Sequence, residues 1–199
     1  DPKALSIIRE ATDAIGGQTA WKEIKNYVAK GSMELTQTGS VTRGAFSISR
    51  AAPNKLAEVM DITGVGSIRE VYNGEEYFVQ SPHTGVLDQS EAMREFVLFS
   101  DFREIFEIER IYQRVTFSGS FFLDGELVNV VEATTADGIK IIFAFSVKSK
   151  FLKLRRGTST IYNYDRYTRF GDVLFPTEQR RNEILKIRIT DVEFNTDIP

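Results

Sequence analysis

The sequence contains no cysteine at all and only one histidine among its 199 residues. The absence of cysteine excludes disulfide bonds, thiolate metal sites and cysteine nucleophiles. It does not assign a compartment, since cytosolic and periplasmic proteins can both lack disulfides. The chemistry of this chain therefore has to come from other side chains.

Few residues are suited to catalysis or to metal binding. The single histidine, His83, stands in the turn-rich stretch Ser81–Gly85, and no group of acidic residues with ligand spacing accompanies it. The sequence has no Gly-x-Ser-x-Gly elbow, no P-loop and no dinucleotide fingerprint. Glu75 and Glu76 could act as paired carboxylates, but charge after a turn is ordinarily solvated. We therefore predict a protein that is not an enzyme and carries no cofactor or metal.

Excess charge of one sign and long apolar runs are also missing. The 25 basic and 28 acidic residues are interleaved along the chain and leave a net charge of −3, which gives a nucleic-acid backbone little to bind. No run approaches the roughly 18 apolar residues of a transmembrane helix. The first residues lack the order of a signal peptide. Because the chain starts at Asp1 without methionine, it is compatible with a signal sequence that has been removed.

Two regions carry a helical period. Apolar residues recur every three or four positions over 3–15, and Gly16–Gly17 follows as a left-handed stop. A short second helix is predicted at 19–25, with Thr19 as its N-cap. The period returns in an insert at about 89–109, where Asp88 and Glu91 have capping-box spacing and Ser100–Asp101 can break the helix.

The rest of the chain alternates with period two, as strands with one buried face do. Turn residues divide these runs, and Asn73–Gly74 is a strong signal for a tight hairpin. The apolar residues of the last strand stand at odd positions from Leu185 to Ile189 and at even positions from Val192 onward. This parity flip, a shift by one residue around Thr190, predicts a β-bulge. The predicted strands span about 27–36, 41–50, 55–62, 66–73, 75–80, 111–123, 126–134, 139–147, 150–157, 159–168, 173–181 and 184–195.

These elements predict one domain over 1–199, of the α+β class and mainly β. Ten to twelve strands joined by hairpin turns rarely stay flat, so we expect a curved antiparallel sheet or an incomplete β-barrel. The apolar stripes of the N-terminal helix and of the insert need burial. We therefore place both against the concave face, with the insert as a lid.

Fifteen phenylalanines and three methionines concentrate on the insert and on strand positions. Such residues either fill a core or line a cavity that accepts acyl chains, and periodicity alone leaves both readings open. The candidate ligand-binding residues are Met33, Leu35, Phe46, Met60 and Phe78 before the insert, Met93, Phe96, Phe99, Phe102 and Phe106 within it, and Phe117, Phe121, Phe143 and Phe145 after it.

A second set of residues is basic and lies late in the chain. It could mark a contact for anionic lipid or an acidic partner, or it could keep edge strands soluble. Its members are Lys148, Lys150, Lys153, Arg155, Arg156, Arg180 and Arg181.

Several short motifs resemble one known family. The N-terminal helix with Gly16–Gly17, a short helix with Trp21, and a Phe-rich insert after Tyr72–Gly74 occur in an order similar to that of the LolA/LolB-like outer-membrane lipoprotein-sorting proteins. Lys30–Gly31, Pro53–Lys55, Tyr164–Tyr167, Gly171 and Leu174–Pro176 add to the likeness. The resemblance implies an incomplete barrel with a helical lid around an apolar cavity. No functional residue of the family is carried over.

The function that the resemblance and the residues favour is a periplasmic carrier or binding protein for lipids or lipoprotein acyl chains. Its expected partners are a lipid or an acylated lipoprotein, with membrane-associated donor and acceptor proteins and no nucleic acid. We expect a monomer, and an N-terminal anchor outside this sequence stays an open alternative. The alternative function is a sensory or scaffolding domain of the same fold that binds a protein partner along a sheet edge.

Overall fold

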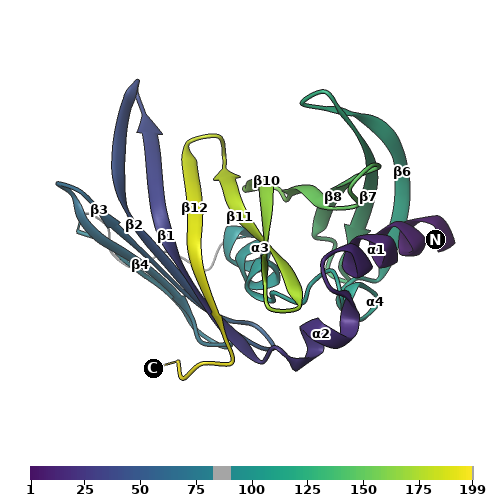
Figure 1. The fold of residues 1–199 in the computed structure, drawn as a ribbon, viewed down its shortest axis with the longest axis horizontal. Coiled ribbons are helices and arrows are strands. Elements are labelled where there is room, and N and C mark those ends of the chain that lie inside the picture. Colours follow the sequence, from purple (N-terminus) through teal and green to yellow (C-terminus); the bar gives the residue numbers. More distant parts are fainter. Residues whose placement is uncertain (83–90, 199) are drawn as a thin grey trace.

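The chain forms one strongly curved antiparallel sheet with helices at its N-terminus and within its curve (Figure 1). The computed structural model describes residues 1–82 and 91–198, and in that part of the chain the sheet has 12 strands. The sheet is not closed. The predicted class, mainly β with a curved sheet of 10 to 12 strands, is confirmed.

The elements follow the predicted order. The helices are α1 (Pro2–Ala14), α2 (Gly17–Glu23), α3 (Glu91–Ser100) and α4 (Ile108–Ile111). The strands before the insert are β1 (Asn26–Gln37), β2 (Ser40–Ala51), β3 (Lys55–Ile62), β4 (Gly66–Tyr72) and β5 (Tyr77–Gln80). Those after it are β6 (Arg114–Leu123), β7 (Glu126–Thr134), β8 (Lys140–Ser146), β9 (Leu152–Arg156), β10 (Ile161–Phe170), β11 (Val173–Arg181) and β12 (Leu185–Phe194).

The order of the strands explains where the insert lies. Across the sheet the order is β5-β4-β3-β2-β1-β12-β11-β10-β9-β8-β7-β6, so every neighbouring pair except β1–β12 is consecutive in sequence. β5 and β6 are consecutive in the chain but form the two opposite edges. The connection between them must therefore cross the molecule, and Figure 1 shows α3 inside the curve of the sheet.

A bulge in β12 sits where the parity flip predicted it. Lys30 pairs with Asp191 and the next residue, Gly31, pairs with Ile189, so Thr190 has no residue opposite. A Cβ at position 31 would lie 1.9 Å from the carbonyl oxygen of Arg188. The absence of a side chain at Gly31 thus permits the close approach of the two strands at the bulge.

The turn at Asn73–Gly74 differs from the expected two-residue hairpin. Tyr72 pairs with Tyr77, so the loop has four residues, and only Gly74 has a positive φ. The side-chain oxygen Oδ1 of Asn73 accepts hydrogen bonds from the backbone N–H groups of Glu75 and Glu76 at 2.9 and 2.8 Å. Asparagine therefore acts through its side chain here and not through a left-handed backbone.

The helices also differ in detail from the predicted ranges. α1 ends before Gly16 and Gly17, which both have positive φ as predicted, but α2 starts at Gly17, so Thr19 lies inside it and is not the N-cap. The predicted break at Ser100–Asp101 is confirmed, because α3 ends at Ser100, but turns occupy 102–107 and the next helix, α4, starts only at Ile108. The proposed capping box with Asp88, like the loop residue His83, lies outside the described residues.

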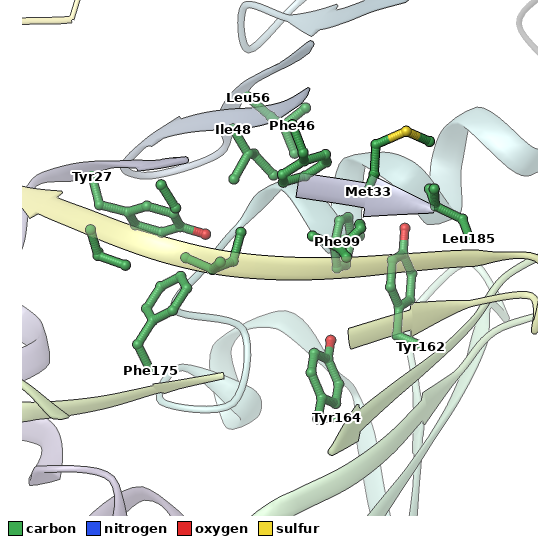
Figure 2. Packing of buried hydrophobic residues seen from close by; sticks show 14 of the residues in the cluster. Tyr27, Met33, Phe46, Ile48, Leu56, Phe99, Tyr162, Tyr164, Phe175 and Leu185 are labelled. Atoms are coloured by element: carbon green, nitrogen blue, oxygen red, sulfur yellow. The ribbon is translucent and has the colours of Figure 1, made fainter. Parts of the chain in front are cut away.

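Two clusters of buried apolar residues cover the inner face of the sheet. The larger one joins α2 and α3 to the strands from β3 across to β10, and Figure 2 shows Phe99 of α3 among the labelled side chains of these strands. The second joins α1 and α4 to β6, β7 and β8. A third, small cluster of Val128, Val130 and Ala144 lies on the opposite face, since their chain neighbours Val131 and Phe143 belong to the second. The inner face positions the site described next.

Candidate ligand cavity

A cavity of about 120 Å³ remains between the insert and the sheet. Its wall is mostly aromatic and aliphatic, with a few charged groups among the apolar side chains. α1, its C-cap residue and α2 contribute Ala11, Ile15 and Trp21, the insert contributes Phe99, Asp101, Phe102, Glu104, Ile105 and Phe106, and the strands complete the wall with Tyr27, Arg50, Leu152, Arg155, Tyr164, Tyr167, Phe175, Pro176 and Gln179.

The insert packs against the inner face of the sheet. The ring of Phe99 stacks on Tyr162 with a centroid distance of 4.1 Å, and the guanidinium carbon of Arg50 lies 4.0 Å from the same ring centroid. The remaining volume is below the roughly 300 Å³ at which ordinary small-molecule sites begin. The interior is therefore not completely filled by side chains, but the space that remains is small. A long acyl chain fits only if the insert moves.

A buried ion pair ties the insert to β9. Arg155 is 2% exposed, and its Nε and Nη2 donate to the two carboxylate oxygens of Glu104 at 2.7 and 2.8 Å. The hydroxyl of Tyr112 also donates to Glu104. Burial alone would lower the pKa of Arg155, but the adjacent carboxylate raises it, so the guanidinium stays charged. Nη1 of Arg155 has no hydrogen-bond partner in the described part of the chain.

Arg50 holds the other side of the insert without a carboxylate. Its side chain is buried, and its Nη1 donates to the backbone carbonyl of Phe99 at 2.8 Å. It forms no ion pair with any residue of 1–82 or 91–198, and its Nε has no partner there. A buried guanidinium without a counter-ion is costly, which makes Arg50 the least compensated charge at the cavity.

A third inward-facing arginine is paired across the sheet. Arg181 of β11 donates to both oxygens of the fully buried Glu58 of β3, at 2.9 and 2.6 Å. Glu70 of β4 is the cross-strand neighbour of Glu58. Burial, reinforced by the charge of Glu58, raises the pKa of Glu70. This cluster lies beside the cavity and does not line it.

Glu95 anchors α3 to the loop between β9 and β10. Its buried carboxylate accepts the backbone N–H groups of Thr158, Ser159 and Thr160 at 2.7, 3.1 and 3.2 Å. A Cβ at Gly157 would lie 1.9 Å from Oε1 of Glu95. The loop can approach this carboxylate only because position 157 has no side chain.

The candidate residues from the sequence take different places. Phe99, Phe102 and Phe106 line the cavity. Met33, Phe46 and Met60 are buried in the larger inner cluster with Leu35 and Phe96 against it, and Phe143 and Phe145 belong to the second cluster with Phe117 against it. Phe78 and Phe121 are 43% and 45% exposed. The side chain of Met93 lies outside the described residues. A ligand role for these residues stays a prediction.

Sequence reasoning missed several wall residues. Trp21, Tyr27, Tyr164 and Phe175 all line the cavity, as does Arg50. The alternation of residues along β2 could have predicted the position of Arg50. Phe46, Ile48 and Arg50 are every second residue of the strand, are all buried and share one face. An arginine in phase with core residues was therefore detectable as inward-facing.

The late basic residues are largely neutralised by acidic partners. Arg155 and Arg181 are the buried ion pairs described above, Lys150 and Lys153 pair with Glu10 and Glu126 at 2.9 and 3.7 Å, and Arg180 pairs with Asp165 at 3.0 Å. They also belong to interior strands and loops, because the edges of the sheet are β5 and β6. Edge protection therefore does not describe them, whereas a contact with anionic lipid or an acidic partner stays a prediction.

The described part of the chain lacks two further features. Among the residues described, no group of three or more His, Asp or Glu is placed to hold a metal ion. In the same residues, no helix has the length and hydrophobicity needed to cross a membrane.

Comparison with known proteins gives the fold. No family model and no curated protein sequence matches the chain. Among solved structures, it is similar to a DUF1329 family protein from Desulfovibrio piger, with a TM-score of 0.65 at 10% identity, covering 100% of this chain and 94% of that one. It is similar to a LolA superfamily protein from Nitrosomonas europaea, with a TM-score of 0.62 at 12% identity over 98% and 94% of the chains. A domain from Vibrio parahaemolyticus assigned to outer-membrane lipoprotein sorting gives 0.59 at 14% identity over 100% and 94%. The protein has the curved-sheet fold of these structures.

Proposed function

We propose, from the fold shared with lipoprotein-sorting proteins of the LolA superfamily, that this protein is a non-catalytic periplasmic carrier for acyl chains of lipids or lipoproteins. The observation that carries the proposal is the cavity whose wall joins Trp21 of α2, Phe102 and Phe106 of the insert, and Phe175 of the sheet. Apolar walls enclosed by a segment that is not part of the sheet suit a ligand that has to be released again.

The energy for such binding comes from apolar burial. Each methylene group taken out of water contributes about 0.8 kcal/mol, so one long acyl chain can be held by contact alone. The free cavity is small, so loading has to displace part of the insert. The hydrogen bond from Arg50 to the carbonyl of Phe99 and the stacking of Phe99 on Tyr162 would be exchanged for contacts with the chain.

Fluorescent fatty-acid uptake tests this function. Phe102→Asp puts a carboxylate into the cavity wall, and we expect it to abolish uptake while circular dichroism and the melting transition show a folded protein. The matched control is Phe122→Asp, since Phe122 is 72% exposed on the β6–β7 hairpin and lies away from the cavity. Uptake that survives Phe102→Asp, or that both variants lose equally, would contradict the assignment of the cavity.

The alternative function, binding of a protein partner along a sheet edge, is favoured by one observation. The sheet is open, and β6 forms one edge with Phe121 and Phe122 exposed near its end. Native mass spectrometry with lipid extraction of the protein purified from a bacterial lysate separates the two functions. Co-purifying lipid supports the carrier, and a lipid-free protein that also takes up no fatty acid supports the alternative.

A further inference from the structure

A second hollow lies on the other side of the insert. It has a volume of about 320 Å³ and runs between α1 and the segment from Ile105 to Glu109. Its deeper wall is apolar, with Leu5 and Ile8 from α1 and Ile108 from α4. We call this space the outer groove and the cavity described above the inner cavity.

The outer groove and the inner cavity share a wall. Ile105 and Phe106 line both of them. Neither side chain is fully buried, and both lie in the stretch of turns between α3 and α4 and not in a regular helix. These two side chains therefore separate the two spaces, and a change of rotamer at Phe106 would remove part of this shared wall. On its inner side, the ring of Phe106 contacts Trp21 with a centroid distance of 5.3 Å.

The polar part of the outer groove carries charges of both signs. Arg9, Asp13 and Glu109 line it and are exposed. None of the three forms an ion pair with another residue of the described chain, whereas the neighbouring Glu10 pairs with Lys150 at 2.9 Å. The groove thus has an apolar inner wall that leads toward the inner cavity, and unpaired charges of both signs at its surface. This arrangement fits an amphiphile with a zwitterionic head group.

We propose that the outer groove and the inner cavity form one binding site for a single-chain zwitterionic phospholipid. Arg9 would contact the phosphate, and Asp13 and Glu109 the ammonium group. The acyl tail would pass between Ile105 and Phe106 into the inner cavity. Because the tail would occupy the cavity proposed above, this site rests on the proposed function. One chain is expected and not two, since the groove and the cavity adjoin only at the wall formed by Ile105 and Phe106.

The sole tryptophan provides the readout. Trp21 is 5% exposed and lines the inner cavity, so its fluorescence reports on what enters there. The probes are lysophosphatidylcholines below their micelle concentration, with bromine atoms either near the end of the acyl chain or next to the head. We expect the distal bromines to quench Trp21 and the proximal ones to quench it much less. Equal quenching by both would overturn the predicted orientation.

Two alanine variants test the route. Phe106→Ala opens the shared wall and should speed association of the distal bromo-lipid about fivefold or more relative to Phe102→Ala. Phe102 is a matched control because it lines only the inner cavity and also packs near Trp21, at 6.5 Å between ring centroids. Equal rates in the two variants would refute passage between Ile105 and Phe106. If Phe106→Ala fails to fold, the difference between distal and proximal bromines in quenching Trp21 of the unaltered protein still decides the orientation of the lipid.

A third variant tests the head-group contacts. Arg9→Gln should weaken binding of the lysophosphatidylcholine about two- to fivefold and leave a brominated fatty alcohol unaffected. Arg69→Gln, at another exposed arginine away from the groove, is the control and should change neither. Equal loss for both ligands would refute the phosphate contact. If no probe quenches Trp21 at all, the proposed function fails too, whereas quenching without the Phe106 and Arg9 effects refutes this site alone.

Discussion

The guanidinium of Arg50, on β2, donates a 2.8 Å hydrogen bond to the backbone carbonyl of Phe99, next to the last residue of α3. The same guanidinium lies over the ring of Phe99 at 4.0 Å. One buried cation thus holds both the backbone and the side chain of the insert against the sheet. Because the acceptor is a neutral carbonyl, this contact is easier to give up than an ion pair.

Arg50→Leu should loosen the insert without unfolding the sheet. The change leaves the Phe99 carbonyl without its donor, but it also removes a buried charge that has no counter-ion, so we expect a net loss of no more than about 1 kcal/mol in unfolding free energy. Hydrogen exchange should accelerate in α3 and stay unchanged in β1 and β12. Arg69→Leu, at an exposed arginine of β4, should leave α3 protection as it is. Unaltered exchange in α3 of Arg50→Leu would mean that other contacts alone hold the insert.

The pair Glu104–Arg155 should behave as a buried unit. Its two side chains are 8% and 2% exposed, so removing either partner leaves the other as an unpaired charge that is shielded from water. We expect Glu104→Gln or Arg155→Met alone to cost about 3–5 kcal/mol, and the double variant to recover part of that loss. Chemical denaturation of the two single variants and the double variant measures the coupling.

The exposed pair Glu34–Arg43 is the control for this cycle. Its side chains are 44% and 73% exposed, and breaking it should cost less than about 1 kcal/mol. Losses of equal size at both pairs would show that burial does not set the energy of the Glu104–Arg155 contact.

The sequence was sufficient to predict the strands and the curved sheet, because residues of one strand report its buried face directly. The parity flip near Thr190 even located the bulge. The partners of the buried charges were not predictable in this way, because they depend on contacts far apart in the chain. Arg50 meets Phe99 across 49 positions, Arg155 meets Glu104 across 51, and Arg181 meets Glu58 across 123.

The aromatic positions show the same limit. An aromatic residue on a strand is compatible with core, cavity wall or surface, and only the final packing decides. Phe99 became part of the cavity wall, Phe143 became core, and Phe121 stayed at the surface near a sheet edge. Composition gave the number of rings but not the space that they leave.

Gly157→Ala should detach α3 from the loop that follows β9. The added Cβ would overlap the carboxylate of Glu95, which accepts three backbone N–H groups of that loop. We expect the unfolding free energy to fall by about 1–3 kcal/mol, because the displaced carboxylate leaves these donors unpaired. A thermal melt measures the loss. Combining Gly157→Ala with Glu95→Ala should add little further loss, whereas full additivity would show that the glycine acts through something else.

Glu70→Gln should change how stability depends on pH. Burial and the charge of Glu58 raise the pKa of Glu70 in the folded protein, so folding favours its protonated form. The stability that this preference contributes is complete below the unfolded pKa, near 4.5, and is lost as the pH rises through the raised folded value. At neutral pH the ionised carboxylate of the partly buried Glu70 therefore destabilises the folded protein, and glutamine, which resembles the protonated acid, removes this charge. Denaturation of both proteins between pH 4 and 8 should show a stabilising effect of the substitution that is largest at the upper end and shrinks as the pH falls. A difference that is constant across this range would mean that Glu70 titrates alike in the folded and unfolded chain.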